Sequence, residues 1–236
     1  MNSGKGGSGH PFSFNDRLET PLGHTPHPPS PQSDLDRTPQ TSIPETDGCE
    51  FIETTITSRQ NISPKRLVEP GPSASELRQM FRSAAAAPDH GLVRPWRFVI
   101  VPPDKRALLA EVFALALVDR DPGATLEQIE TAREKAYRAP VLMLVVARLG
   151  DCEPPIPVLE RMVSVGGAVQ NVLLMAQGQG YGAGLTSGQA MQSPRMRELF
   201  SLRPGEEAVC FLNIGTVTKR KAQRLHPEDC QFVSTL

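Results

Sequence analysis

A short polar turn holds residues whose types and spacing suit contact with a small ligand. Asp89, His90 and Gly91 follow a helical pattern and lie shortly before an apolar strand predicted over Phe98–Val101. Turns at the ends of strands are where α/β architectures place groups that meet ligands. A neutral imidazole at His90 is able to donate a hydrogen bond, and Trp96 adds a flat apolar face with one more donor. A loop histidine without any ligand fits the local sequence equally well.

A second candidate is the glycine-dense segment Gly178–Gly188. Glycines let backbone amides approach a planar ligand without side chains between them. The segment follows a helical pattern rather than a strand, so it is not a dinucleotide-binding fingerprint. A glycine-rich turn by itself is weak evidence for a binding site.

The elements that position these segments are predicted from apolar periodicity and capping residues. Ser73 and Glu76 have the spacing of a capping box at a helix start. The continuous apolar run Val141–Ala147 predicts a central strand covered on both faces. Further helices are expected over Asp104–Val118, Thr125–Tyr137, Val158–Gln179 and Pro194–Phe200, and a last strand over Val209–Ile214. The fold class is therefore α+β, a sheet with helices on both faces.

Composition limits the function classes that the chain fits. Its 236 residues, 39% of them hydrophobic, are enough for one sizeable core, and a formal net charge of −1 argues against a general nucleic-acid or acidic-membrane binder. No apolar run approaches the roughly 18 residues of a membrane span, and the polar start lacks the apolar part of a secretory signal. We therefore expect a cytoplasmic protein. The four cysteines are scattered and indicate neither a zinc site nor a disulfide framework.

The first 50 residues differ from the remainder in composition. Residues 1–50 are rich in Pro, Ser and Thr and are expected to form a disordered tail, whereas 51–236 form the folded domain. His10, His24 and His27 are spaced too irregularly to indicate a metal site. A proline-rich tail is also able to dock on a partner as a polyproline segment, and nothing in it identifies that partner.

From Ile56 to Leu236 the chain resembles the FMN-dependent nitroreductase family. Four landmarks stand in the family's order: Arg59–Ser63, the helix Val165–Gln177, the glycine-rich Gly178–Gly188, and Phe211–Thr216. The closest resemblance is to a compact branch of NAD(P)H nitroreductases, whose members have an Ala-Pro-Asp-His turn before Pro-Trp and an aromatic residue. The resemblance implies the nitroreductase-like fold, with a central mixed sheet and a homodimer to which the helix Val158–Gln179 contributes. A helix that is merely buried in the core would need no partner.

The resemblance also implies which residues hold FMN. Arg59, Gln60 and Asn61 stand where the family usually has Arg-Arg-Ser around the FMN phosphate and ribityl chain, and the two amides lower the local positive charge. His90 matches a histidine that lies beside the flavin. Arg220 follows the last strand, where family members often bind the phosphate. A solvated basic tail accounts equally well for Arg220.

By the same resemblance, Leu185, Thr186 and Ser187 match the stretch whose backbone amides approach the flavin N5. Relatives often have Trp and Arg where this chain has Leu185 and Thr186. The wall of the expected flavin site is therefore smaller and less charged in this chain. Leu92 and Ala86 also depart from residues that relatives carry near the flavin.

The expected activity is FMN-dependent transfer of hydride from NAD(P)H to flavin N5. A flat acceptor such as a nitroaromatic or a quinone then takes the reducing equivalents in a ping-pong mechanism, without a catalytic acid–base side chain. One alternative is a flavin-binding regulatory or interaction protein with little turnover, and another is a flavin enzyme of different chemistry. The choice between NADH and NADPH stays open.

Overall fold

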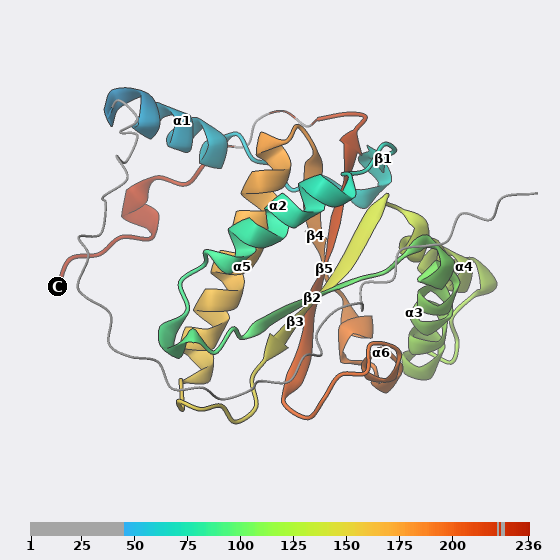
Figure 1. Ribbon diagram of the computed structural model, residues 1–236. Helices are drawn as coiled ribbons and strands as arrows, with labels where there is room; N and C mark the ends of the chain where they lie inside the picture. The colour runs from blue at the N-terminus through green and yellow to red at the C-terminus, as the bar shows by residue number, and fades with distance from the viewer. Residues whose placement is uncertain (1–44, 221, 223–224) are drawn as a thin grey trace, which may run out of the picture. The chain divides into compact units, whose positions relative to one another are not determined.

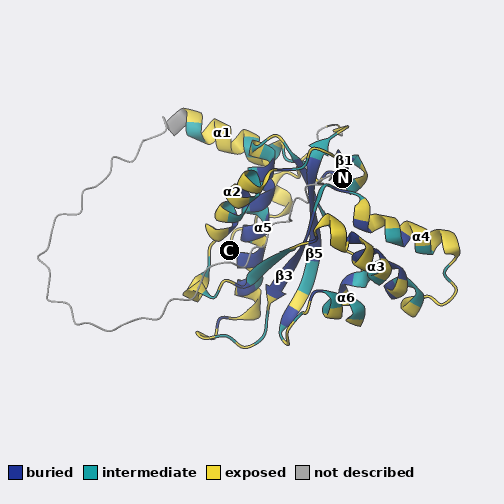
Figure 2. Ribbon diagram, turned by 45° about the vertical axis from the view of Figure 1, so that its right-hand side comes forward, coloured by how far each residue is buried: buried dark blue, intermediate teal, exposed yellow. Residues whose placement is uncertain are grey.

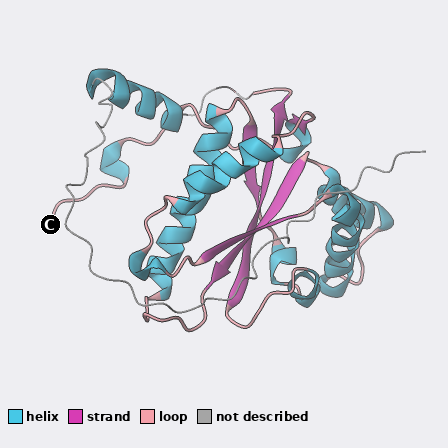
Figure 3. Cartoon of the chain, viewed as in Figure 1, coloured by secondary structure: helices cyan, strands magenta, loops and turns pink. Residues whose placement is uncertain are grey.

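The computed structural model describes residues 45–220, 222 and 225–236. The six helices of this part are α1 (Glu45–Thr57), α2 (Ala74–Ala85), α3 (Arg106–Arg120), α4 (Leu126–Glu134), α5 (Val158–Gly178) and α6 (Pro194–Leu199). Its strands are β1 (Leu67–Val68), β2 (Trp96–Ile100), β3 (Val141–Arg148), β4 (Gly182–Thr186) and β5 (Glu206–Val217), as Figure 3 shows. None of the described helices is long and apolar enough to cross a membrane.

The N-terminal boundary differs from the one expected from composition. Helix α1 begins at Glu45 and crosses the expected boundary between residues 50 and 51. Most of the predicted tail, with His10, His24 and His27, lies outside the described residues.

The sheet is antiparallel, so the expectation of a mixed sheet is wrong. Its strand order is β1-β5-β3-β2, and β4 also pairs with β5. Every pair of named strands is antiparallel. In the described part of the chain, parallel pairing is limited to an isolated bridge between Asn61 and Ala183. The sequence does not reveal strand direction, because a continuous apolar run indicates burial on both faces in either arrangement.

Helices cover both faces of this sheet, as predicted. Figure 1 shows α2 and α5 on one side and α3, α4 and α6 on the other. Strand β3 lies in the middle, and its side chains alternate between two cores. Met143 and Val145 pack with α2 and α5, whereas Leu142 and Leu144 pack with α3 and α6. Figure 2 shows the buried residues concentrated along β3, β5 and the inner side of α5.

Capping residues fix where two of the helices begin. The predicted capping box at Ser73 and Glu76 is present at the start of α2. A second capping box, between Thr125 and Gln128, starts α4. Each such cap stabilises its helix by roughly 1 kcal/mol.

The glycine-dense segment contains a strand that the sequence did not indicate. Gly182–Thr186 is β4, between β5 and the Asn61 bridge. A Cβ at Gly182 would collide with the Val217 side chain, and a Cβ at Gly184 would collide with the Ile62 carbonyl oxygen. The Val217 side chain and the Ile62 backbone therefore leave room only for glycine at these two positions, and the low strand propensity of glycine hid the strand.

Two buried arginines tie loops to the sheet. Arg106 is 5% exposed, and its guanidinium donates to the carbonyl oxygens of Val101 (2.9 Å), Ala136 (2.7 Å) and Pro140 (3.0 Å). Arg161 is equally buried and donates to the carbonyl oxygens of Arg148 (3.0 Å), Leu149 (3.0 Å) and Gly150 (2.6 Å). These charge-assisted bonds hold the backbone after β2 and on both sides of β3.

Candidate functional site

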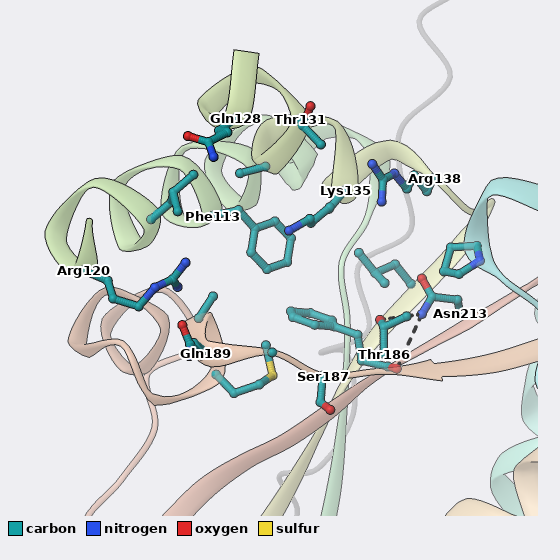
Figure 4. Close-up of a pocket in the computed structure, with 18 of the residues that line it drawn as sticks. Phe113, Arg120, Gln128, Thr131, Lys135, Arg138, Thr186, Ser187, Gln189 and Asn213 are labelled. Carbon is teal, nitrogen blue, oxygen red and sulfur yellow. Dashed lines mark hydrogen bonds between the residues drawn. The ribbon is translucent and has the colours of Figure 1, made fainter. Parts of the chain in front are cut away.

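A cavity of about 890 Å³ lies between the α3–α4 hairpin, the end of β4 and the middle of β5. Figure 4 shows side chains from α4 above it and from β4, β5 and the following turn below it. This volume is in the range of sites for small ligands and cofactors. The cavity is therefore the main candidate for a binding site among the described residues.

The inner wall of the cavity is apolar with one fixed polar group. Phe113, Leu142 and Phe211 supply the apolar surface. Asn213 is 2% exposed, and its side-chain amide donates to the Thr186 hydroxyl at 3.0 Å (Figure 4). Asn213 belongs to a predicted landmark, but no feature of the local sequence indicated that it lies in the site. The wall suits a flat, largely apolar ligand with a polar edge.

The predicted flavin-contact stretch meets the cavity at one edge. Thr186, Ser187 and Gly188 all line it. A Cβ at Gly188 would meet no atom within 4 Å, so the backbone there is open to a ligand. Leu185 lies outside the cavity lining, and its amide donates to the Asn61 side-chain oxygen at 2.7 Å. That amide is thus occupied by the protein itself.

Asn61 contacts the strand rather than an open cavity. The Asn61 side-chain oxygen accepts from the Leu185 amide. The amide of the next residue, Ile62, donates to the Ala183 carbonyl oxygen at 3.0 Å. The segment around Asn61 therefore forms the outer edge of β4. Two predicted landmarks, separated by more than a hundred residues, meet here.

Arg59, Gln60 and Arg220 lie together at the other end of β4. They line a small cavity beside Gly182 and Tyr181. Its volume is about 10 Å³, roughly the space for one water molecule. The two arginines predicted to hold a phosphate are thus neighbours, but a phosphate would fit only after their side chains move apart.

His90 lies far from these arginines. Its Nδ1 is 2.7 Å from Glu160 Oε2 near the start of α5, and both side chains are exposed. Arg59 lies beside Gln177, near the end of the same helix. A helix of 21 residues is about 30 Å long. One copy of the chain therefore does not bring His90 and Arg59 to the same ligand.

Three cations that sequence analysis did not nominate also line the large cavity. Arg120 ends α3, and Lys135 and Arg138 follow α4. The pKa of Lys135 is lowered mainly by partial burial, and further by the positive charges of Arg138 and Arg120. Polar residues on one face of a short helix look like an ordinary solvated surface in sequence, so only the fold reveals that they face a cavity.

The fold and the site define a class: an antiparallel α+β domain with a small-molecule cavity beside an edge strand. Comparisons with known proteins then place it. A family model described as "Nitroreductase family" matches residues 63–216. A Haemophilus influenzae protein named "Putative NAD(P)H nitroreductase" is 32% identical over 77% of this chain and 94% of its own length.

Two solved structures share the fold. A nitroreductase-like family protein from Bacillus cereus aligns with a TM-score of 0.68 at 18% identity, over 78% of this chain and 95% of its own. A Clostridium difficile protein titled "FMN-dependent Nitroreductase" aligns with a TM-score of 0.55 at 14% identity, over 78% of this chain and 98% of its own. The chain belongs to the nitroreductase family.

Proposed function

We propose that this chain is an FMN-dependent oxidoreductase that takes hydride from NAD(P)H and reduces a flat acceptor such as a nitroaromatic or a quinone. The observation that carries the proposal is the large cavity over Thr186–Gly188, with its aromatic wall. Family membership and the names of the similar proteins support FMN and NAD(P)H as the cofactor and donor. We also propose a cytoplasmic location, where NAD(P)H is produced.

The residues present fit the ring of FMN. An isoalloxazine needs an apolar slot, polar groups at its pyrimidine edge and open backbone near N5. Phe113 and Phe211 provide the slot, and Ser187 and Gly188 provide the open backbone. When bound, FMN supplies a carrier that accepts two electrons and a proton from the donor and releases them to the acceptor.

The chain's own contribution is to bind and orient. Thr186 is held by Asn213, so its position at the cavity edge is fixed before any ligand arrives. Preorganised groups of this kind lower the cost of aligning donor and acceptor.

Arg59 and Arg220 are proposed to hold the phosphate. Neither has an ion-pair or hydrogen-bond partner among the described residues, and both line the small cavity. Four residue steps along β4, about 13 Å, separate this end from Thr186 at about 3.3 Å per step. That separation suits a cofactor with a ring at one end and a phosphate at the other.

We further propose a homodimer in which His90 of one copy completes the site of the other. Helix α5 leaves Leu159 80% and Val163 71% exposed near its start, and Leu92 beside His90 is 76% exposed. Large apolar side chains gathered on one surface suit a protein interface. The same contact would bring His90 to the FMN bound by the partner copy, whereas His90 lies far from the phosphate site of its own copy.

The overall reaction balances without an added catalytic side chain. Reduction of one nitro group to a nitroso group consumes one NAD(P)H and one proton and releases NAD(P)⁺ and water. Because donor and acceptor would use the same face in turn, ping-pong kinetics are expected.

The decisive experiment is an absorbance spectrum of the purified protein before and after anaerobic NADH, and then NADPH. A flavin band at about 450 nm that bleaches would support the reductase. Bound flavin that neither donor reduces would favour a flavin-binding protein with little turnover. A colourless protein that takes up no FMN would overturn the proposal.

A further inference from the structure

We propose that Arg120 and Lys135 make the large cavity selective for acceptors that carry an anionic oxygen group, such as a carboxylate on a flat ring. This inference rests on the proposed function, because it names the class of acceptor for the same site. It does not follow from family membership, since it depends on side chains of the α3–α4 hairpin.

The first observation is that these cations are not neutralised. Neither Arg120 nor Lys135 has an ion-pair or side-chain hydrogen-bond partner among residues 45–220, 222 and 225–236. Within the same residues, the ion pair of Arg138 is a long contact of 3.8 Å to Glu134. Glu127 is the single carboxylate in the cavity lining. The described lining therefore carries an excess of positive charge.

Three carboxylates of the hairpin are paired with cations outside the cavity lining. Glu111 and Glu130 hold Arg133, at 2.8 and 2.6 Å. Asp119, next to Arg120 in sequence, holds Arg195 at 2.6 Å. These three acids therefore bind cations outside the cavity lining and do not neutralise Arg120 or Lys135.

The cations repel one another. The pKa of Lys135 is lowered by partial burial and by the nearby charges of Arg138 and Arg120. An anionic group placed between them would relieve this repulsion and form charge-assisted hydrogen bonds. A neutral ligand of the same shape would gain neither.

The geometry favours the acceptor over the phosphate of FMN. Figure 4 shows Lys135 and Arg120 across the cavity from Thr186 and Ser187, the proposed ring contacts. The proposed phosphate cations lie beside Gly182, at the opposite end of β4. A substrate stacked on the ring would therefore point its substituent at the hairpin.

The test compares two acceptors of nearly equal shape, 4-nitrobenzoate and 4-nitrobenzamide, with FMN-loaded protein and NADH. The native chain is expected to have at least a tenfold higher kcat/KM for the carboxylate. Lys135→Gln and Arg120→Gln should each reduce that ratio about tenfold, the usual effect of one charge-assisted hydrogen bond. Lys105→Gln is the matched control, because Lys105 is an exposed cation at the far end of α3 and lies outside the cavity lining. It should leave the ratio unchanged.

A binding measurement gives a readout that does not need turnover. Calorimetry of the two nitro compounds with the protein as purified, without a donor, should show tighter binding of 4-nitrobenzoate and loss of that preference in both variants. This arm keeps the inference testable even if the protein proves to bind no flavin, which would overturn the proposed function alone.

Three results would overturn this inference while leaving the oxidoreductase intact. Equal kcat/KM for the two acceptors would show that the cations select nothing. Variants that lower kcat/KM for NADPH but not for NADH, with the acceptor ratio unchanged, would assign the cations to the donor's phosphate. Variants that lose FMN would assign them to the cofactor's phosphate.

Discussion

Cations occupy two different environments in this chain. The guanidinium groups of Arg106 and Arg161 are buried and meet backbone carbonyl oxygens of nearby loops. Arg120 and Lys135 face the large cavity and have no such partner among the described residues. Both groups look alike in sequence, as cations at helix ends or within helices.

The difference separates residues that build the fold from residues that are free to bind. A buried cation is tolerated when hydrogen bonds satisfy most of its donors, and removing it leaves carbonyl groups without that donor. A cation beside a cavity contributes little to the fold and retains its capacity for a ligand. Substitutions in the two regions should therefore change different measured quantities.

Arg106→Met should have the largest effect on stability. It leaves the carbonyl oxygens of Val101, Ala136 and Pro140 without their donor. The free energy of unfolding should fall by about 3–5 kcal/mol. Urea denaturation measures this, with the exposed Arg78→Met on α2 as the control. A loss below about 1 kcal/mol would mean that the buried cation does not hold these loops.

Arg59→Ala should leave the fold intact and weaken FMN binding by about 1.5–3 kcal/mol, through loss of a charge-assisted bond. Fluorescence titration with FMN gives the dissociation constant, and Arg78→Ala controls for a general loss of positive charge. Unchanged FMN affinity would remove Arg59 from the proposed phosphate site.

Glu206→Gln removes the negative charge from a half-buried ion pair and so tests how much that pair stabilises the fold. Glu206 accepts from Arg97 at 3.1 and 2.8 Å and from the Arg203 amide at 3.0 Å. Burial alone would raise its pKa, but these bonds and the charge of Arg148 outweigh burial and lower the pKa. The substitution should reduce the free energy of unfolding by about 1.5 kcal/mol at pH 7.

The pH dependence of that loss follows from the direction of the shift. A carboxyl whose pKa is lower in the folded state stabilises the fold above its unfolded pKa, about 4.3, and loses this contribution as pH falls through the folded pKa. The native protein and Glu206→Gln should therefore converge in stability in strong acid. Glu207→Gln, at an exposed ion pair with Arg197, is the control and should change stability by less than about 0.5 kcal/mol. A Glu206→Gln loss that is constant with pH would contradict the pairing.

Lys135→Gln should have the smallest effect on stability, within about 0.5 kcal/mol, because Lys135 has no ion-pair partner in the part of the chain that the structure describes. Thermal unfolding of the variant and of Lys105→Gln should give equal midpoints. A large drop for Lys135→Gln would place Lys135 with the cations that build the fold.

The sequence predicted the elements that have strong periodicity or caps. The helix after Ser73, the central strand at Val141 and the long helix from Val158 are all present within a few residues. Strand β4 and the antiparallel pairing were missed, because glycines hide a strand and strand direction depends on contacts distant in sequence.

The candidate site was predicted in part. The structure brings the segments carrying Asn61 and Leu185 together at β4, and their contacts with FMN stay a prediction. Arg120, Lys135 and Asn213 were missed, because cavity lining is a property of packed elements and not of local sequence.

The length of α5 has a genetic consequence. If His90 serves the neighbouring copy, each chain carries two half-sites, and Arg59→Ala and His90→Ala damage different halves. Mixed dimers of the two variants would then hold one site with both defects and one native site. Random pairing would then make about a quarter of all sites native. If Arg59 and His90 of the same chain formed each site, no site in the mixture would be native.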